Sequence, residues 1–131
     1  MNDLAEVQAV AEHNLVITRF HGVMDLPRIL AYLERLASID WIDSANRLVD
    51  CRDISAIDLN FEGLGEIVDA RAGGRDLTGK IAIVSPDEVS YGFARMYQQM
   101  VSEQNTQVQI FRDMAACAEW LAIPIELAEG G

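Results

Sequence analysis

Two spacings of apolar residues alternate along the chain, and their order predicts its architecture. Short runs with the composition or the two-residue alternation of β-strands are separated by longer segments whose apolar residues recur every three or four positions, as on one face of a helix. Gly22 is expected to end the second strand, after a turn near His13-Asn14 has joined it to the first. The predicted strands cover roughly 5–10, 15–20, 47–51, 80–84 and 107–111. The predicted helices cover roughly 26–37, 61–72 and 86–103, and a last one runs from 114 to Pro124.

Several of these helices have a recognisable start or end. Asp25 precedes the first helix, with Pro27 in the first turn, where a missing amide hydrogen costs little. The run Ser85-Pro86-Asp87-Glu88 predicts a capping box, with Ser85 as the N-cap and Glu88 three residues later. Asp113 is expected to cap the last helix, and Pro124 to end it.

The order β-β-α-β-α-β-α-β-α predicts an α/β fold. Alternating strands and helices favour a largely parallel sheet, and the first hairpin adds one antiparallel strand. In the run KIAIV at 80–84, apolar residues occupy both the odd and the even positions, and so both faces of the predicted strand. This is typical of a central strand covered on both faces. We therefore expect a five-stranded, mostly parallel mixed sheet with four helices, formed by a single domain over residues 1–131 with its core at about 5–123.

Charge and cysteine content narrow the classes of function. The chain of 131 residues has a formal net charge of −11. It lacks a basic stripe, so nucleic acid is not expected as a partner, and an anionic membrane surface is disfavoured for the same reason. No apolar run approaches the roughly 20 residues of a transmembrane segment, and the N-terminus lacks a signal-peptide pattern. The cytoplasm is therefore expected, where Cys51 and Cys117 would be buried thiols rather than a disulfide.

Three segments carry a resemblance to a known family. They are LVDCRDISAIDL at 48–59, AIVSPDEVSYGFARMYQQM at 82–100 and VQIFRDMAACAEWL at 108–121. In this order and spacing the chain resembles the STAS domain of anti-sigma-factor antagonists and sulfate-transporter tails, and more closely its SpoIIAA-like branch. That branch is related in fold to the CRAL-TRIO lipid carriers. The resemblance implies a binding or regulatory domain rather than an enzyme.

One departure from the family pattern concerns a regulatory switch. In signalling antagonists of this family a strand ends in aspartate, and an Asp-Ser-Ser-Gly motif follows, whose second serine is phosphorylated. Asp50 and Asp58 stand at the matching aspartates, but Asn60 replaces the phosphorylatable serine. Asparagine caps a helix as well as serine does, although it cannot accept a phosphoryl group. The resemblance therefore supports partner binding at this surface more than control by a kinase.

Candidate chemistry is sparse. Asp50, Asp53 and Asp58 have the carboxylates that magnesium or calcium prefers, but their spacing is irregular and fits turn residues that bond nearby backbone. His13 and His21 have no orienting partner visible in the sequence. Ser85 follows a strand without the flanking glycines of a nucleophile elbow. We expect no catalytic residue, no metal and no cofactor.

The apolar stripe of the third helix and the composition of the second suggest a mobile element. Methionine and aromatic residues at helical spacing are usually core, but methionines also line adaptable binding surfaces. The second helix contains Gly63 and Gly65, and Gly73-Gly74 is expected to stop it. Each internal glycine costs about 1 kcal/mol of helix stability, so this helix is the best candidate for a moving lid.

Two functions remain open at this point. The first is a non-catalytic module that docks a protein partner near the loop between the third strand and the second helix, through Asp58, Leu59, Asn60, Phe61, Gly63 and Leu64. The second is a carrier for a small apolar or lipid-like ligand beneath the second helix. Its predicted pocket residues are Phe61, Leu64, Ile67, Val68, Phe93, Met96, Tyr97 and Met100. A homodimer is a further open possibility.

Overall fold

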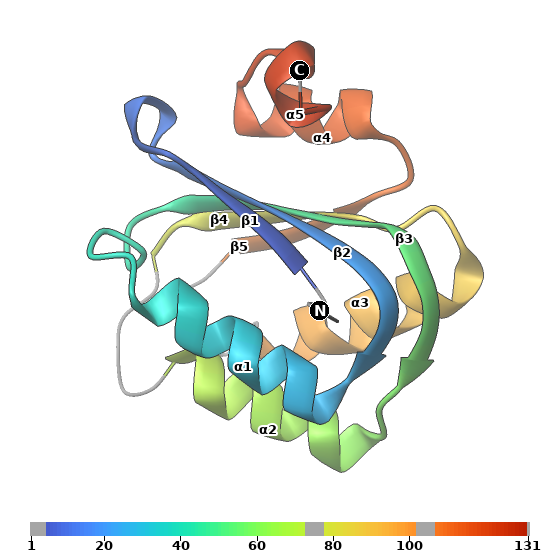
Figure 1. Ribbon diagram of the computed structural model, residues 1–131. Coiled ribbons are helices and arrows are strands. Elements are labelled where there is room, and N and C mark those ends of the chain that lie inside the picture. The colour runs from blue at the N-terminus through green and yellow to red at the C-terminus, as the bar shows by residue number, and fades with distance from the viewer. Residues whose placement is uncertain (1–4, 73–77, 102–106, 131) are drawn as a thin grey trace.

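A computed structural model describes residues 5–72, 78–101 and 107–130, and it shows the predicted α/β fold (Figure 1). Among the described residues none of the helices is both long and apolar enough to cross a membrane. The strands are β1 (Ala5–Val10), β2 (Leu15–Asp25), β3 (Asn46–Asp58), β4 (Lys80–Val84) and β5 (Gln107–Phe111). The helices are α1 (Leu26–Ala37), α2 (Phe61–Ala72), α3 (Glu88–Val101), α4 (Met114–Leu121) and the short α5 (Ile125–Ala128), with a 3-10 turn at Ala11–His13.

The five strands form one sheet in the order β1-β2-β3-β4-β5. β1 pairs with β2 in the antiparallel direction, and every later pair is parallel, which confirms the predicted mixed sheet. β4 lies between β3 and β5, as its continuous apolar run predicted. The structure adds α5 to the four predicted helices, and the fully buried Ala128 places this helix in the core beyond the expected limit near 123.

Helices cover both faces of the sheet. α1, α2 and α3 lie on one side, and α4 with α5 lies on the other (Figure 1). Alternate residues of β4 divide between the two cores: Ile81 and Ile83 face the three-helix side, while Ala82 and Val84 face α4. On the α4 side lies Cys117, and on the other lies Cys51, so the two predicted buried thiols are confirmed as free.

Strands β2 and β3 are longer than predicted, and this is the main correction to the fold. β2 continues through Gly22 to Asp25, and β3 continues past 51 to Asp58. The two extensions pair with each other, from His21 opposite Asp53 to Asp25 opposite Asp58, with register shifts around Gly22. The left-handed φ of 79° at Gly22 is one that glycine adopts without steric cost, so this residue bends the strand instead of ending it.

The start of α3 is also shifted from the prediction. The backbone amide of Ser90 donates to Asp87 Oδ1 at 2.8 Å, so Asp87 caps the helix rather than Ser85. Ser85, directly after β4, is fully buried, and its hydroxyl makes no hydrogen bond to an amide of the described first turn. The other predicted caps are confirmed, because Asp25, Asn60 and Asp113 each accept a hydrogen bond from the amide three residues later.

Candidate functional site: an apolar cavity with a buried arginine

The described residues enclose a partly open cavity between the sheet and the helices α1, α2 and α3. Its volume is about 110 Å³, and its walls are almost entirely apolar. The residues that line it are Phe20, Met24, Ile29, Tyr32, Leu33, Arg47, Val49, Cys51, Ile54, Ile57, Leu59, Leu64, Ile67, Ile81, Ile83, Ser90, Phe93, Ala94 and Tyr97. Concave, mostly apolar sites with a few polar groups are the usual form of a small-molecule site.

The extended ends of β2 and β3 build one wall of this cavity. In Figure 1 the two strands bend away from the sheet and continue toward α2. Met24 comes from the extension of β2, and Ile54 and Ile57 come from that of β3. The segment that the sequence suggested to be an acidic loop is therefore a strand whose apolar residues face the cavity.

Helix α2 closes the side of the cavity away from the sheet. It lies below α1 and α3 in Figure 1, farther from the strands than either of them. Leu64 and Ile67 contribute the lining residues of this helix, and Leu59 contributes one from the turn before it. A rotation or opening of α2 would therefore expose the cavity without disturbing the sheet.

A cluster of polar groups interrupts the apolar lining. Thr18 Oγ1 and Tyr32 Oη lie 2.6 Å apart in a buried hydrogen bond. Arg47 is close enough to Tyr32 to act on it both through its charge and through a hydrogen bond, and Tyr97 also lies near the Tyr32 phenol. Burial raises the pKa of Tyr32, and the charge of Arg47 and the hydrogen bond with Thr18 only partly offset this effect. The phenol consequently stays protonated and able to donate at neutral pH.

Arg47 is the one charged residue among the described residues that line the cavity. It is only 7% exposed, and no carboxylate of the described part of the chain forms an ion pair with it. Every second residue of a strand lies on the same face, so Arg47, Val49 and Cys51 line the cavity wall one after another along β3.

The thiol of Cys51 is not poised for reaction. Burial raises the pKa of Cys51 to about 12, and a contact with the Ser85 hydroxyl offsets little of that effect. Ser85 Oγ has no hydrogen bond to nitrogen or oxygen of the described residues, so no base activates it. Neither group meets the requirements of a nucleophile, namely a lowered pKa or an adjacent base.

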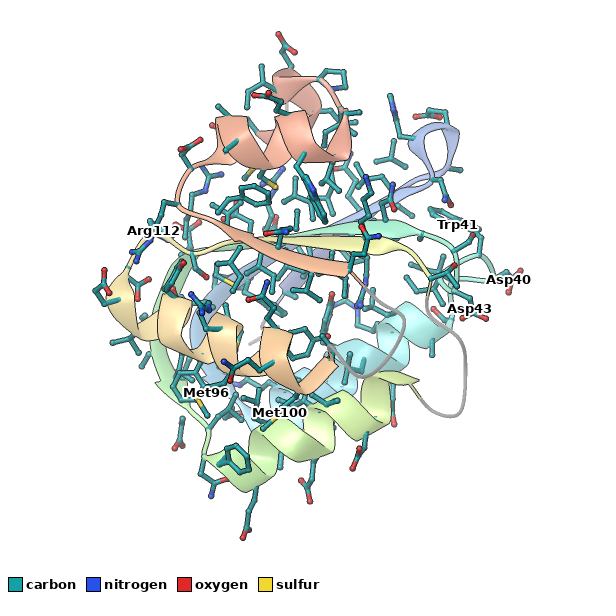
Figure 2. All side chains as sticks on the ribbon, turned by 180° about the vertical axis from the view of Figure 1, so that it is seen from behind. Asp40, Trp41, Asp43, Met96, Met100 and Arg112 are labelled. Carbon is teal, nitrogen blue, oxygen red and sulfur yellow. The ribbon has the colours of Figure 1, made fainter. Side chains whose placement is uncertain are left out.

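Some of the predicted pocket residues line the cavity, and others do not. Leu64, Ile67, Phe93 and Tyr97 do so. Val68, Met96 and Met100 instead pack in the surrounding core, and Figure 2 shows both methionines on the side of α3 that faces α2. The two methionines therefore lie between α2 and α3 rather than in the cavity wall.

Phe61 requires a correction. The sequence placed it on the inward face of α2, but its side chain is 67% exposed. It is the first residue of α2, immediately after the Asn60 cap, so it lies at the end of the helix and before its buried residues begin at Gly63. Val89, the second residue of α3, is also exposed.

The predicted partner-binding residues lie at the start of α2. Asp58, Asn60 and Phe61 are exposed, whereas Gly63 and Leu64 are buried and Leu59 lines the cavity. The exposed part of this segment is therefore small.

The sequence did not single out the polar members of the cavity. In the sequence, Arg47 looks like an ordinary charged residue at the start of a strand. Tyr32 looks like one more residue of the apolar face of α1. A signal was present: odd-numbered positions 47, 49 and 51 share one face of β3, so Arg47 had to face a helix-covered side.

Asp50 lies on the opposite face of the sheet and has a structural role. Its carboxylate accepts from Arg19 at 3.0 Å and from Arg52 at 2.9 and 3.0 Å. Asp53 and Asp58 are exposed, and the described residues contain no cluster of three or more groups that could hold a metal. His13 and His21 are also exposed.

Comparison with known proteins supports the fold. No family model matches the chain, and no curated protein matches it. Among solved structures it is similar to an uncharacterised protein of the DUF3478 family from Shewanella loihica PV-4, which has a SpoIIAA-like fold. The TM-score is 0.57 at 14% sequence identity, with 89% of this chain and 91% of that chain covered. The resemblance in fold is thus confirmed: this chain has a SpoIIAA-like fold.

Proposed function

We propose that this protein is a non-catalytic cytoplasmic binding module that takes a small apolar ligand into the cavity beneath α2. The observation that carries the proposal is the cavity itself, a space of about 110 Å³ walled by apolar side chains from β2, β3 and three helices. Apolar cavities of similar size, about 150 Å³, are known to bind molecules such as benzene.

The absence of activation at the candidate nucleophiles supports a non-catalytic role. The pKa of Cys51 is raised to about 12, and so is that of Cys117 on the other face of the sheet. Asp50 is held by two arginines and does not face the cavity. The residues that do face it are suited to enclosing a ligand.

Titration with a small amphiphile tests the proposal. We expect saturable binding of hexanoate or 1-hexanol by calorimetry, together with chemical-shift changes of the cavity residues. Ala94 lines the cavity, so Ala94→Leu fills part of it and should weaken binding. Ala115→Leu makes the same change at an exposed position of α4 and serves as the control. No binding of either compound, with no ligand in native mass spectra of freshly purified protein, would contradict the proposal.

A second function has one observation in its favour, the exposed aromatic ring of Phe61 beside the Asn60 cap. Exposed aromatic side chains are enriched where partner proteins dock. A photo-crosslinking residue at position 61 should then capture a defined partner in cells, whereas the same residue at the exposed Glu119 on α4 should not. Equal capture at both positions would count against docking at α2, and a crosslink between two copies would identify a homodimer.

A further inference from the structure

The cavity is not uniformly apolar, because the end near Arg47 is polar and positively charged. Arg47 and Tyr32 both line it, Arg47 is 7% exposed, and the Tyr32 phenol interacts with Arg47, Thr18 and Tyr97. An arginine only donates hydrogen bonds and stays charged at all physiological pH values. This end of the cavity therefore presents positive charge and hydrogen-bond donors.

A buried guanidinium without a counter-ion is costly. Burial of an unpaired charge is unfavourable, and the described residues provide Arg47 with no carboxylate partner. The contrast with Arg19 and Arg52 is direct, because both of them pair with Asp50 on the other face of the sheet. Among the described residues, Asp50 is the counter-ion of both Arg19 and Arg52, whereas no carboxylate pairs with Arg47, so a group from outside can take that place.

We propose that the ligand of this cavity is a small apolar monocarboxylate, whose carboxylate is bound by Arg47 and whose hydrocarbon body lies among the apolar residues. This inference rests on the proposed function and specifies its ligand. Guanidinium and carboxylate match in geometry, and the planar fork allows two parallel hydrogen bonds.

Charge and size restrict the ligand class further. One arginine offsets one negative charge, so a phosphate dianion would be left with uncompensated charge in an apolar site. The volume of about 110 Å³ corresponds to a single ring or a short acyl chain rather than to a full lipid. The Tyr32 phenol beside Arg47 stays protonated and hydrogen-bonded to Thr18, so it adds no second charge to this end of the cavity.

The experiment compares two ligands of equal chain length, hexanoate and 1-hexanol, on the wild-type protein at pH 7. Hydrogen bonds to a charged group are about twice as strong as those between neutral groups, so we expect hexanoate to bind about tenfold or more tightly than 1-hexanol. In Arg47→Met the preference should disappear, with 1-hexanol binding retained or improved. Arg95→Met removes an exposed arginine of α3 and should leave the preference unchanged.

The outcomes separate this inference from the proposed function. Equal affinity for both ligands in the wild type overturns the carboxylate inference while the cavity remains a ligand site. Binding of neither ligand overturns both. If Arg47→Met fails to fold, Arg47→Lys replaces it: the charge is retained but the planar fork is lost, so the preference should fall. The inference would also be overturned if Arg47→Lys kept the full preference for hexanoate over 1-hexanol and hexanoate shifted only the resonances of residues remote from Tyr32.

Discussion

Gly79 is a residue at which a single methyl group has no space. A Cβ built there would lie 1.8 Å from the carbonyl oxygen of Ala45, part of the backbone that leads into β3. Gly79→Ala therefore forces the two backbone segments apart, and we expect a loss of about 1–3 kcal/mol in the free energy of unfolding. Urea denaturation measures it. Gly92→Ala is the comparison: a Cβ at this helical position meets nothing within 4 Å, so this variant should gain about 1 kcal/mol instead.

Asn60 caps α2, because its Oδ1 accepts from the Gly63 amide at 2.7 Å. It stands at the position where the STAS pattern, which this sequence resembles, has a serine. Asn60→Ala should cost about 1 kcal/mol of stability, and Asn60→Ser should cost much less because serine caps equally well. Thermal unfolding of the two variants distinguishes them. Equal losses would show that the side-chain cap is not what matters at this position.

A kinase test follows from the same residue. With asparagine at position 60, incubation with a kinase of the type that acts on related antagonists should leave residues 58–65 unmodified. Phosphopeptide mapping checks this. Phosphate at the exposed Ser55 on the β3 extension would show that a switch exists at a different position.

At the scale of elements, α2 is the helix that should open first. It contains Gly63 and Gly65, each worth about 1 kcal/mol against alanine, and it lies in the outer position beneath α1 and α3. Hydrogen exchange should therefore be faster over residues 61–72 than over 88–101. Equal protection of the two helices would contradict a lid.

The two glycines of α2 give a matched pair of variants. A Cβ at Gly65 meets nothing within 4 Å, so Gly65→Ala should stabilise the helix by about 1 kcal/mol. A Cβ at Gly63 would lie 3.3 Å from the capping Asn60 Oδ1, so Gly63→Ala should gain less. Gly65→Ala should also slow exchange over 61–72 and slow the uptake of hexanoate. Unchanged uptake with slower exchange would separate helix opening from ligand entry.

Element identity was predictable because apolar spacing depends directly on burial. The double-sided apolar run of β4 and the cap at Asp113 follow from that rule. The ends of β2 and β3 were not predictable, because each extension is stabilised by pairing with the other, and pairing between distant segments leaves little local signal. The prediction that Phe61 lines the cavity was wrong because the helical period shows which face is apolar, but not at which residue of the helix burial begins.

At the scale of the whole molecule, an ion-pair network joins the sheet to the C-terminal helix. Arg52 bonds both Asp50 and Glu129, at 2.9 and 2.8 Å, and Arg19 donates to Asp50 and to the carbonyl of Ala128 at 2.7 Å. The network therefore links β2 and β3 to α5. The two arginines remain partly exposed, whereas the Asp50 side chain is 6% exposed.

This network predicts how stability changes in acid. Burial alone would raise the pKa of Asp50, but hydrogen bonds from Arg52 and Arg19, together with the charge of Arg52, hold it below its ordinary value of 3.8. A carboxyl whose pKa is lower in the folded state binds fewer protons there than in the unfolded chain. Its contribution is therefore fully present well above pH 3.8, and it is lost progressively as the pH falls through 3.8 toward the folded pKa, which is lower.

Asp50→Asn tests that contribution. At pH 7 it should lower the free energy of unfolding by about 3 kcal/mol, the low end for a broken buried pair, because both arginines keep contact with water. The difference from wild type should shrink as the pH is lowered from 5 to 3, because the unfolded wild-type chain then takes up a proton at Asp50 that the folded protein does not yet bind. Urea denaturation across this range measures it, with Glu88→Gln as the control, whose exposed pair with Arg112 should contribute little. A difference that stays constant with pH would mean that Asp50 stabilises the C-terminal helix through its shape and hydrogen bonds rather than through its charge.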